Sequence, residues 1–302
     1  MREGKETKER ILILSDFHIG GKHFDDERRG TLLRLLTSRG ADFTRIILLG
    51  DIFELQQADA EVAIKQAALV MQTLAELAGA NVAVDYVVGN HDIDVNEEPT
   101  FLDKHFGIPD SVWTKHYPHL DLPLAGKRVR FEHGHLHDPH YQTNANLYNQ
   151  LSSTVGRWMA ESPRRLDMAG DLLRRWDLLK QVFSSSKEKY TEKWDGPFSA
   201  FKVAACRLLY EHQPSYDRIV FGHTHYPYLR EFMDGKIYVN SGCWTAYETC
   251  LTYDEATDDF NWLEGGLEPI REAALPLLLP EMSQRYITRN QPPRNLRGRR
   301  VI

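Results

Sequence analysis

The sequence predicts a layered α/β domain, and two observations support this fold class. Short apolar runs, which are typical of buried strands, alternate with longer segments whose apolar residues recur at helical spacing. After five of the apolar runs, an Asp, Asn or His stands at the second position beyond the run. In α/β sheets, functional groups gather beyond the carboxyl ends of the strands. We therefore expect these polar side chains to meet at one edge of the fold and to form its functional site.

The expected elements can be given in chain order. The five strands that end at polar residues cover residues 11–14, 46–49, 82–88, 129–131 and 219–221. Between the first three strands, residues 32–36 and 62–77 carry apolar side chains at helical spacing. After Gly222 the pattern changes to short strands at residues 236–239 and 249–253. We expect residues 1–302 to form a single domain, because this length is enough to bury a substantial core.

A helical segment at about residues 141–213 separates two of the polar strand ends. Its Leu and Trp residues recur at helical spacing, and arginines that include Arg157 and Arg164 lie between them. Two interpretations stay open: a helical hairpin with a solvated face, or a lid whose arginines and apolar face contact the substrate. The residues from about 291 onward are rich in Pro, Asn and Arg, and we expect them to form a mobile tail.

The composition is typical of a globular protein outside the membrane, with 42% apolar and 26% charged residues. A net charge of −6 disfavours a nucleic-acid binder. The charged first ten residues do not resemble a signal peptide, and the apolar run at residues 273–279 is too short to span a bilayer. Three cysteines without paired metal spacing fit reduced thiols in the cytoplasm. Arginines at residues 294–300 leave open a peripheral contact with the inner face of a membrane.

The first two strands end at carboxylates. Asp16-Phe17-His18 follows the first strand, and residues two apart in an extended segment point to the same side, where they can share one metal ion. Gly50-Asp51 follows the second strand, and the two carboxylate oxygens can bridge two metals. Either motif alone is also compatible with an ordinary turn.

The third strand ends at Gly89-Asn90-His91-Asp92. Asn90 offers a neutral carbonyl ligand, and the neighbouring His91 can face the substrate instead of the metal. A plain turn explains the Gly-Asn pair but does not explain the His-Asp pair that follows it directly.

His133 follows the fourth strand, and His223 and His225 follow the fifth. This mixture of nitrogen and oxygen ligands suits Mn²⁺, Fe, Zn²⁺ or Co²⁺ better than Ca²⁺, and the lack of cysteine ligands disfavours a structural zinc site. We expect His135 to contact the substrate or to support a ligand through a hydrogen bond. Each motif is weak alone, but five of them in order at strand ends strongly indicate a metal centre.

The order Asp-x-His, Gly-Asp, Gly-Asn-His-Asp, His-Gly-His, Gly-His-Thr-His resembles the calcineurin-like metallophosphoesterase superfamily. The resemblance implies a four-layer α/β/β/α sandwich with a helical insertion, and two divalent metal ions, with Mn²⁺ as the first choice. One metal would take Asp16, His18, Asp51 and His225, and the other would take Asp51, Asn90, His133 and His223. His91 would be the outer-sphere catalytic histidine, and Asp92 would orient it.

The resemblance also implies hydrolysis of a phosphoester or pyrophosphate bond. Two metals roughly 3.5–4 Å apart lower the pKa of a bound water and offset the charge that builds during in-line displacement. A protonated His91 would stabilise that charge or donate a proton to the leaving oxygen.

Within the superfamily, residues 15–21 and 50–54 resemble the first two motifs of the UDP-2,3-diacylglucosamine pyrophosphatases, which implies a lipid-nucleotide substrate. His91 stands where that family commonly has Arg, and His-Gly-His at residues 133–135 stands where it has His-Gly-Asp. These two features resemble general phosphodiesterases. A soluble phosphodiesterase or phosphatase for nucleotides or other small substrates therefore stays open, as does a non-catalytic binding scaffold like the retromer subunit.

Overall fold

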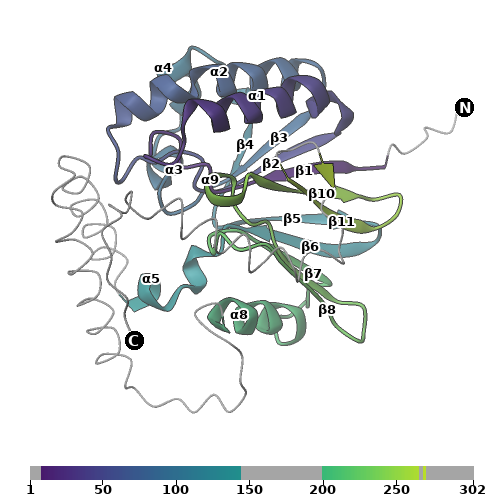
Figure 1. Ribbon diagram of the computed structural model, residues 1–302. Helices are drawn as coiled ribbons and strands as arrows, with labels where there is room; N and C mark the ends of the chain where they lie inside the picture. Colours follow the sequence, from purple (N-terminus) through teal and green to yellow (C-terminus); the bar gives the residue numbers. More distant parts are fainter. Residues whose placement is uncertain (1–7, 144–198, 265–267, 270–302) are drawn as a thin grey trace, which may run out of the picture.

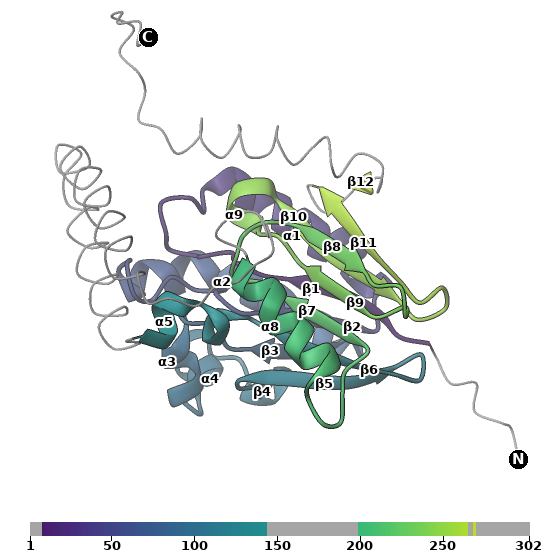
Figure 2. The same ribbon diagram turned by 90° about the horizontal axis from the view of Figure 1, so that it is seen from below.

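The computed structural model describes residues 8–143, 199–264 and 268–269. Two β-sheets face each other, with helices on their outer faces (Figure 1). α1 (Asp26–Arg39) and α2 (Ala60–Gly79) cover the larger sheet, and α8 (Ser199–Tyr210) covers the smaller one, as the view from below in Figure 2 also shows. The expected α/β/β/α order of layers is therefore confirmed.

The larger sheet has seven strands, and four of them form its parallel half. β1, β2, β3 and β4 lie side by side in parallel, while β10 pairs with the other side of β1 in antiparallel orientation. In spatial order the strands are β12 (Glu268–Pro269), β11 (Asp259–Glu264), β10 (Thr249–Asp254), β1 (Arg10–Leu14), β2 (Arg45–Leu49), β3 (Ala83–Val87) and β4 (Thr114–His116).

The smaller sheet has five strands with a parallel centre, because β6, β7 and β9 run in the same direction between two antiparallel edge strands. In spatial order the strands are β5 (His119–Leu124), β6 (Lys127–Glu132), β7 (Arg218–Phe221), β9 (Ile237–Asn240) and β8 (Tyr228–Glu231). The five strands that end at polar residues therefore divide between two sheets, three in the larger and two in the smaller.

The strand β1 shows why its sequence is a continuous apolar run. Successive side chains of a strand point to opposite faces of the sheet. Leu12 and Leu14 pack in the core under the outer helices, and Ile11 and Ile13 pack in the core between the two sheets. From Ile11 to Leu14 both faces are buried, so these four positions are all apolar, and only Arg10 at the start of the strand is exposed.

The outer helices begin at side chains that accept hydrogen bonds from their first turns. The carboxylate of Asp25 accepts from the backbone N–H of Arg28 at 2.9 Å, and that of Asp59 accepts from Glu61 at 2.8 Å. On the other side of the molecule, Phe201 and other apolar residues of α8 pack against the outer face of the smaller sheet. Residues 199–210, which fall within the expected insertion, thus form the fourth layer.

Three short helices follow strand ends at the left of Figure 1. They are α3 (Ile93–Glu97) after β3, α5 (Pro139–Thr143) after β6 and α9 (Trp244–Tyr247) after β9. The remaining helical segments are α4 (Phe101–Phe106), η1 (Gly40–Asp42), η2 (Asp110–Val112) and η3 (His135–His137). Arg157, Arg164 and the tail from about residue 291 lie outside the described residues.

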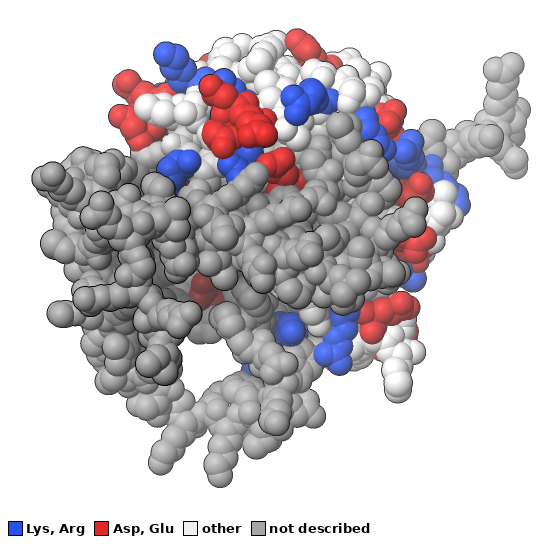
Figure 3. Space-filling model, in the orientation of Figure 1, with Lys and Arg blue, Asp and Glu red and all other residues white. Residues whose placement is uncertain are grey.

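On the described part of the face in Figure 3, Lys and Arg side chains lie beside Asp and Glu side chains, as on an ordinary solvated surface. Within the described ranges, no helix has both the length and the apolar character that crossing a bilayer requires.

Candidate metal centre

The loops that follow β1 and β2 run side by side at the edge of the larger sheet. The backbone N–H of Asp16 donates to the carbonyl of Gly50 at 3.0 Å, and that of His18 donates to the carbonyl of Asp51 at 2.9 Å. The side chains of Asp16 and Asp51 are almost fully buried. Backbone pairing beyond the ends of the strands therefore fixes two candidate ligand loops relative to each other.

The loops of the smaller sheet are joined to each other and to the larger sheet. The backbone N–H of Gly222 donates to the carbonyl of His133 at 3.1 Å, which links the loops after β7 and β6. The hydroxyls of Ser15 and Ser241 lie 2.7 Å apart and connect the loop after β1 with the loop after β9. The carboxyl ends of the two sheets thus meet at one site.

Five of the seven predicted ligands have a backbone conformation that is uncommon for residues other than glycine. Their φ angles lie between 49° and 63°, in the left-handed region. These residues are Asp16, His18, Asp51, His223 and His225. Such conformations cost on the order of 1 kcal/mol or more each and concentrate at functional sites, where the surrounding structure enforces them. The clustering of strained backbone at these positions supports a functional role for them.

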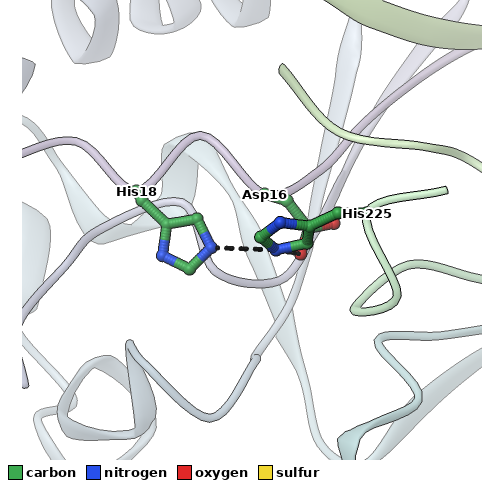
Figure 4. A group of neighbouring side chains, drawn as sticks. All are labelled: Asp16, His18 and His225. Atoms are coloured by element: carbon green, nitrogen blue, oxygen red, sulfur yellow. Dashed lines mark hydrogen bonds and ion pairs between the residues drawn. The ribbon is translucent and has the colours of Figure 1, made fainter. Parts of the chain in front are cut away.

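The first ligand cluster consists of Asp16, His18 and His225 (Figure 4). The Nε2 atom of His225 lies 3.1 Å from a carboxylate oxygen of Asp16 and 3.3 Å from Nε2 of His18. All three residues come from loops after β1 and β7, so both sheets contribute to this cluster.

The second ligand cluster consists of Asp51, His133 and His223. The Nε2 atom of His133 lies 3.1 Å from Oδ2 of Asp51 and 3.3 Å from Nδ1 of His223. The same Oδ2 atom of Asp51 is 3.9 Å from Nε2 of His18 in the first cluster. Asp51 therefore lies between the two clusters, which is the position that a bridging carboxylate requires.

The chemistry of these donor atoms fits two cations. Two nitrogens that bind one ion at about 2.1 Å lie about 3.0–3.4 Å apart, and the His18–His225 and His133–His223 nitrogen pairs are both 3.3 Å apart. Asn90 is fully buried, yet neither atom of its amide group has a hydrogen-bond partner among the described residues. A buried amide without a partner is costly, and a cation beside its oxygen would satisfy it.

Gly89 allows the loop after β3 to pack directly against Asp51. A Cβ atom at this position would lie 2.2 Å from a carboxylate oxygen of Asp51 and 2.4 Å from its backbone nitrogen. The backbone N–H of His91 also donates to that carboxylate, at 2.9 Å. Any side chain at residue 89 would therefore displace the proposed bridging group.

His91 is held by Glu54, a residue that sequence reasoning did not single out as a site residue. The Nδ1 atom of His91 lies 2.7 Å from one carboxylate oxygen of Glu54, and Nδ1 of His18 lies 3.0 Å from the other. Burial raises the pKa of Glu54, but the two imidazoles outweigh this effect and lower the pKa to about 2. Its ionised carboxylate can therefore accept from both rings. In the sequence, Glu54 is the carboxylate that ends the motif Gly50-Asp51-Ile52-Phe53-Glu54. Ile52 and Phe53 are buried in the structure.

The pKa of His91 is set by a balance between burial and two carboxylates. Burial lowers the pKa, but the charges of Asp51 and Glu54 outweigh it and raise the pKa to about 9. Both carboxylates therefore favour the protonated form of the ring.

Asp92, which was expected to orient His91, makes its side-chain hydrogen bonds to other groups. The carboxylate of Asp92 accepts from the backbone N–H groups of Ile52 and Gly89, both at 2.7 Å, and from the hydroxyl of Tyr86. Consecutive residues of this loop point in different directions, so Asp92 lies in the core while His91 lies at the site. Asp92 instead ties the loop after β3 to the loop after β2.

His135 lies beside the second cluster without a hydrogen bond to it. Its ring is buried, lies 5.5 Å from the His133 ring and packs edge-on against Tyr141 at 4.9 Å. Neither ring nitrogen has a hydrogen-bond partner within the described part of the chain. Burial and the neighbouring His133 lower the pKa of His135 to about 2. The expected support of a ligand through a hydrogen bond is not what the structure shows, and a contact with substrate stays a prediction.

This chain is similar to a known protein family and to several known proteins. The family model for calcineurin-like phosphoesterases matches residues 9–227. A UDP-2,3-diacylglucosamine hydrolase from Porphyromonas gingivalis (strain ATCC BAA-308 / W83) is 24% identical over 269 residues, which cover 83% of this chain and 96% of that protein. Among solved structures, hypothetical protein PH1004 from Pyrococcus horikoshii OT3 is similar at 12% identity, 94% coverage of both chains and a TM-score of 0.44. A dimetal phosphatase from Danio rerio is similar at 14% identity, with 86% and 97% coverage and a TM-score of 0.43. The match over most of its length shows that this chain belongs to the calcineurin-like phosphoesterase family.

Proposed function

We propose that this chain hydrolyses phosphoester or phosphoanhydride bonds at a dinuclear metal centre, and that UDP-2,3-diacylglucosamine is the first candidate substrate. The observation that carries the reaction type is the position of Asp51 between two clusters of ligands. The imidazole of His91 lies directly beside them, because its backbone N–H donates to Asp51. The family match supports a metal-dependent phosphoesterase, and the two-cluster geometry supports two ions rather than one.

The predicted ligands would form two sets, one for each ion. Mn²⁺ is our first choice for these ions. Asp16, His18 and His225 would hold one, Asn90, His133 and His223 the other, and Asp51 would bridge them. When bound, the ions would supply Lewis-acid activation of water and would offset phosphoryl charge.

His91 would provide the proton for the leaving oxygen. Glu54 accepts from Nδ1 of the ring, so Nε2 is the atom left for contact with the substrate. The hydrogen bond to the Glu54 carboxylate favours the protonated ring, which can donate to an oxygen that gains negative charge as its bond to phosphorus breaks. Burial of His91 keeps competing water away from the hydrogen bond that it donates and strengthens this hydrogen bond.

The lipid-nucleotide substrate is supported by the relative from Porphyromonas gingivalis and by the motifs at residues 15–21 and 50–54. A substrate with acyl chains would require contact with a membrane surface or a micelle. The test incubates the Mn²⁺-loaded protein with UDP-2,3-diacylglucosamine and measures UMP by phosphorus-product analysis, with Asn90→Ala as the inactive control. Release of UMP by the wild type alone would support this substrate.

A phosphodiesterase for small soluble substrates is the second candidate. His91 in place of the Arg that is common in the lipid enzymes favours it, because an imidazole paired with Glu54 is a general proton donor without a lipid-specific feature. Cleavage of an aryl phosphodiester without UMP release would support this candidate and would exclude the lipid substrate. If two bound ions gave no hydrolysis of either substrate, the chain would be a binding scaffold on the same fold.

A further inference from the structure

The loop after β6 carries a carboxylate that the proposed reaction does not use. Asp138 lies between η3 and α5, and its Oδ2 atom is 3.2 Å from Nε2 of His223. We infer that Asp138 is a positioning residue, which fixes the ring orientation and the tautomer of His223 and so sets the metal affinity of the second cluster. This inference rests on the proposed metal centre and names a residue outside the predicted ligand set.

The two nitrogens of the His223 ring face two different groups. Nε2 faces Asp138, and Nδ1 faces Nε2 of His133 at 3.3 Å. A neutral imidazole has one N–H and one lone pair, so donation from Nε2 to the carboxylate leaves the lone pair on Nδ1. That lone pair then points to the second cluster, as a metal ligand requires.

The use of Nδ1 distinguishes His223 from the other two supported imidazoles. His18 and His133 direct Nε2 to the centre, because their Nδ1 atoms face Glu54 at 3.0 Å and the carbonyl of Leu49 at 2.9 Å. In His223 the roles of the two nitrogens are exchanged. The position of Asp138 accounts for this exchange, since its carboxylate occupies the side of the ring that Nε2 faces.

Asp138 is itself held in place. Its backbone N–H donates to the carbonyl of His135 at 3.1 Å, and its carbonyl accepts from the backbone N–H of Gln142 at 2.9 Å. The ring of Phe201 from α8 lies 5.6 Å from the His223 ring. The Asp138 and His223 side chains are 16% and 11% exposed, so their hydrogen bond lies largely out of water and is stronger for it.

The test compares metal binding by the wild type, Asp138→Asn and Asp138→Leu, measured by equilibrium dialysis at fixed free Mn²⁺ with metal analysis. Loss of a hydrogen-bond partner behind a ligand typically lowers metal affinity by about 10–100-fold. We expect a loss of this size at one of two sites in Asp138→Leu. The loss in Asp138→Asn should be smaller, because the amide oxygen can still accept from Nε2. Glu98→Gln is the control. It removes a carboxylate that lies 3.0 Å from Nε2 of His105, a histidine outside the predicted ligand set.

A second readout does not depend on metal. In the metal-free wild type, long-range ¹⁵N–¹H spectra of histidine side chains should show His223 with its proton on Nε2, and Asp138→Leu should lose this preference. Unchanged affinity and tautomer in both Asp138 variants would overturn the inference and leave the phosphoesterase proposal intact. A wild type that binds no divalent metal would sink the proposed function, while the tautomer measurement would still decide whether Asp138 fixes the ring. If Asp138→Leu does not fold, Asp138→Ala, which also removes the acceptor but adds no bulk, carries both measurements.

Discussion

Glu54→Gln should weaken metal binding at the first cluster more than it slows the chemical step. The carboxylate of Glu54 has one oxygen for His91 and one for His18. A glutamine keeps only one acceptor, so one imidazole must face an NH₂ group. The backbone N–H of Gln57 donates to the oxygen on the His91 side at 3.0 Å, which holds the amide oxygen there. The NH₂ group should therefore face His18.

The expected loss of metal affinity follows from the loss of the hydrogen bond between Glu54 and His18. A hydrogen bond to a charged group contributes about 1.5–3 kcal/mol, and each 1.4 kcal/mol corresponds to a factor of about ten. His18 can accept from the NH₂ group only by moving its proton to Nε2, which is its ligand atom. We therefore expect the affinity of one metal site to fall by about 10- to 150-fold. The hydrogen bond of His91 should survive without the charge of Glu54, so kcat at saturating Mn²⁺ should fall, but by less than the metal affinity.

The assay titrates Mn²⁺ against hydrolysis of an aryl phosphodiester and fits kcat and the activating metal concentration separately. Glu98→Gln, which alters a carboxylate–imidazole pair with His105, is the matched control. A variant with unchanged metal dependence and a strongly reduced kcat would refute the reasoning, because it would show that the amide turns its NH₂ group to His91.

Three further predictions concern metal removal, packing and pH. After EDTA treatment, Mn²⁺ at about 100 times Kd should stabilise the wild type by about 2.7 kcal/mol per site, and Asp51→Asn should lose most of this gain in thermal unfolding. Gly89→Ala should destabilise the chain by about 1–3 kcal/mol in urea, because its Cβ would lie 2.2 Å from Asp51; equal stability would contradict the packing. Burial raises the pKa of Asp85, but His116 and Arg45 outweigh this effect and hold it below 3.8. The ionised carboxylate therefore stabilises the fold above pH 3.8, and Asp85→Asn should cost about 1–3 kcal/mol at pH 7 in urea unfolding. This cost should shrink as the pH falls below 3.8 through the lower pKa of the folded state.

The strands with two buried faces were predictable. The run expected at residues 46–49 is β2 (Arg45–Leu49), and the run expected at residues 82–88 is β3 (Ala83–Val87). Both lie inside the larger sheet, where burial on both faces favours apolar residues, and the one buried carboxylate of β3, Asp85, is paired with Arg45 and His116. β4, β5 and β8 were not predicted, because they lie at the sheet edges and carry polar and exposed residues that interrupt an apolar run.

The helix α8 shows a second limit of the sequence. Residues 199–210 lie within the helical insertion expected at about residues 141–213, and they form a helix. Helical periodicity shows which face of a helix is apolar and does not show which surface that face covers. Packing against β7 and β9 gives α8 its place as the outer layer.

The sequence by itself determined which metal-binding residue types stand at which strand ends. Four predicted ligands follow β1 and β7, and the structure places three of them, Asp16, His18 and His225, in one cluster. Chain order brings Asp16 and His18 together because both follow β1, whereas His225 reaches them only because the ends of the two sheets meet.

Only the tertiary structure decided which group supports each imidazole. Glu54 is 37 residues from His91, and Asp138 is 85 residues from His223, whereas the adjacent Asp92 turns into the core. Neighbours in sequence point in different directions at a left-handed or tightly turned backbone, so proximity along the chain does not predict a hydrogen bond. The hydrogen-bond partner of each imidazole depends on which loops the two sheets bring together. It also depends on the direction in which each buried N–H group points, because a buried N–H group needs an acceptor.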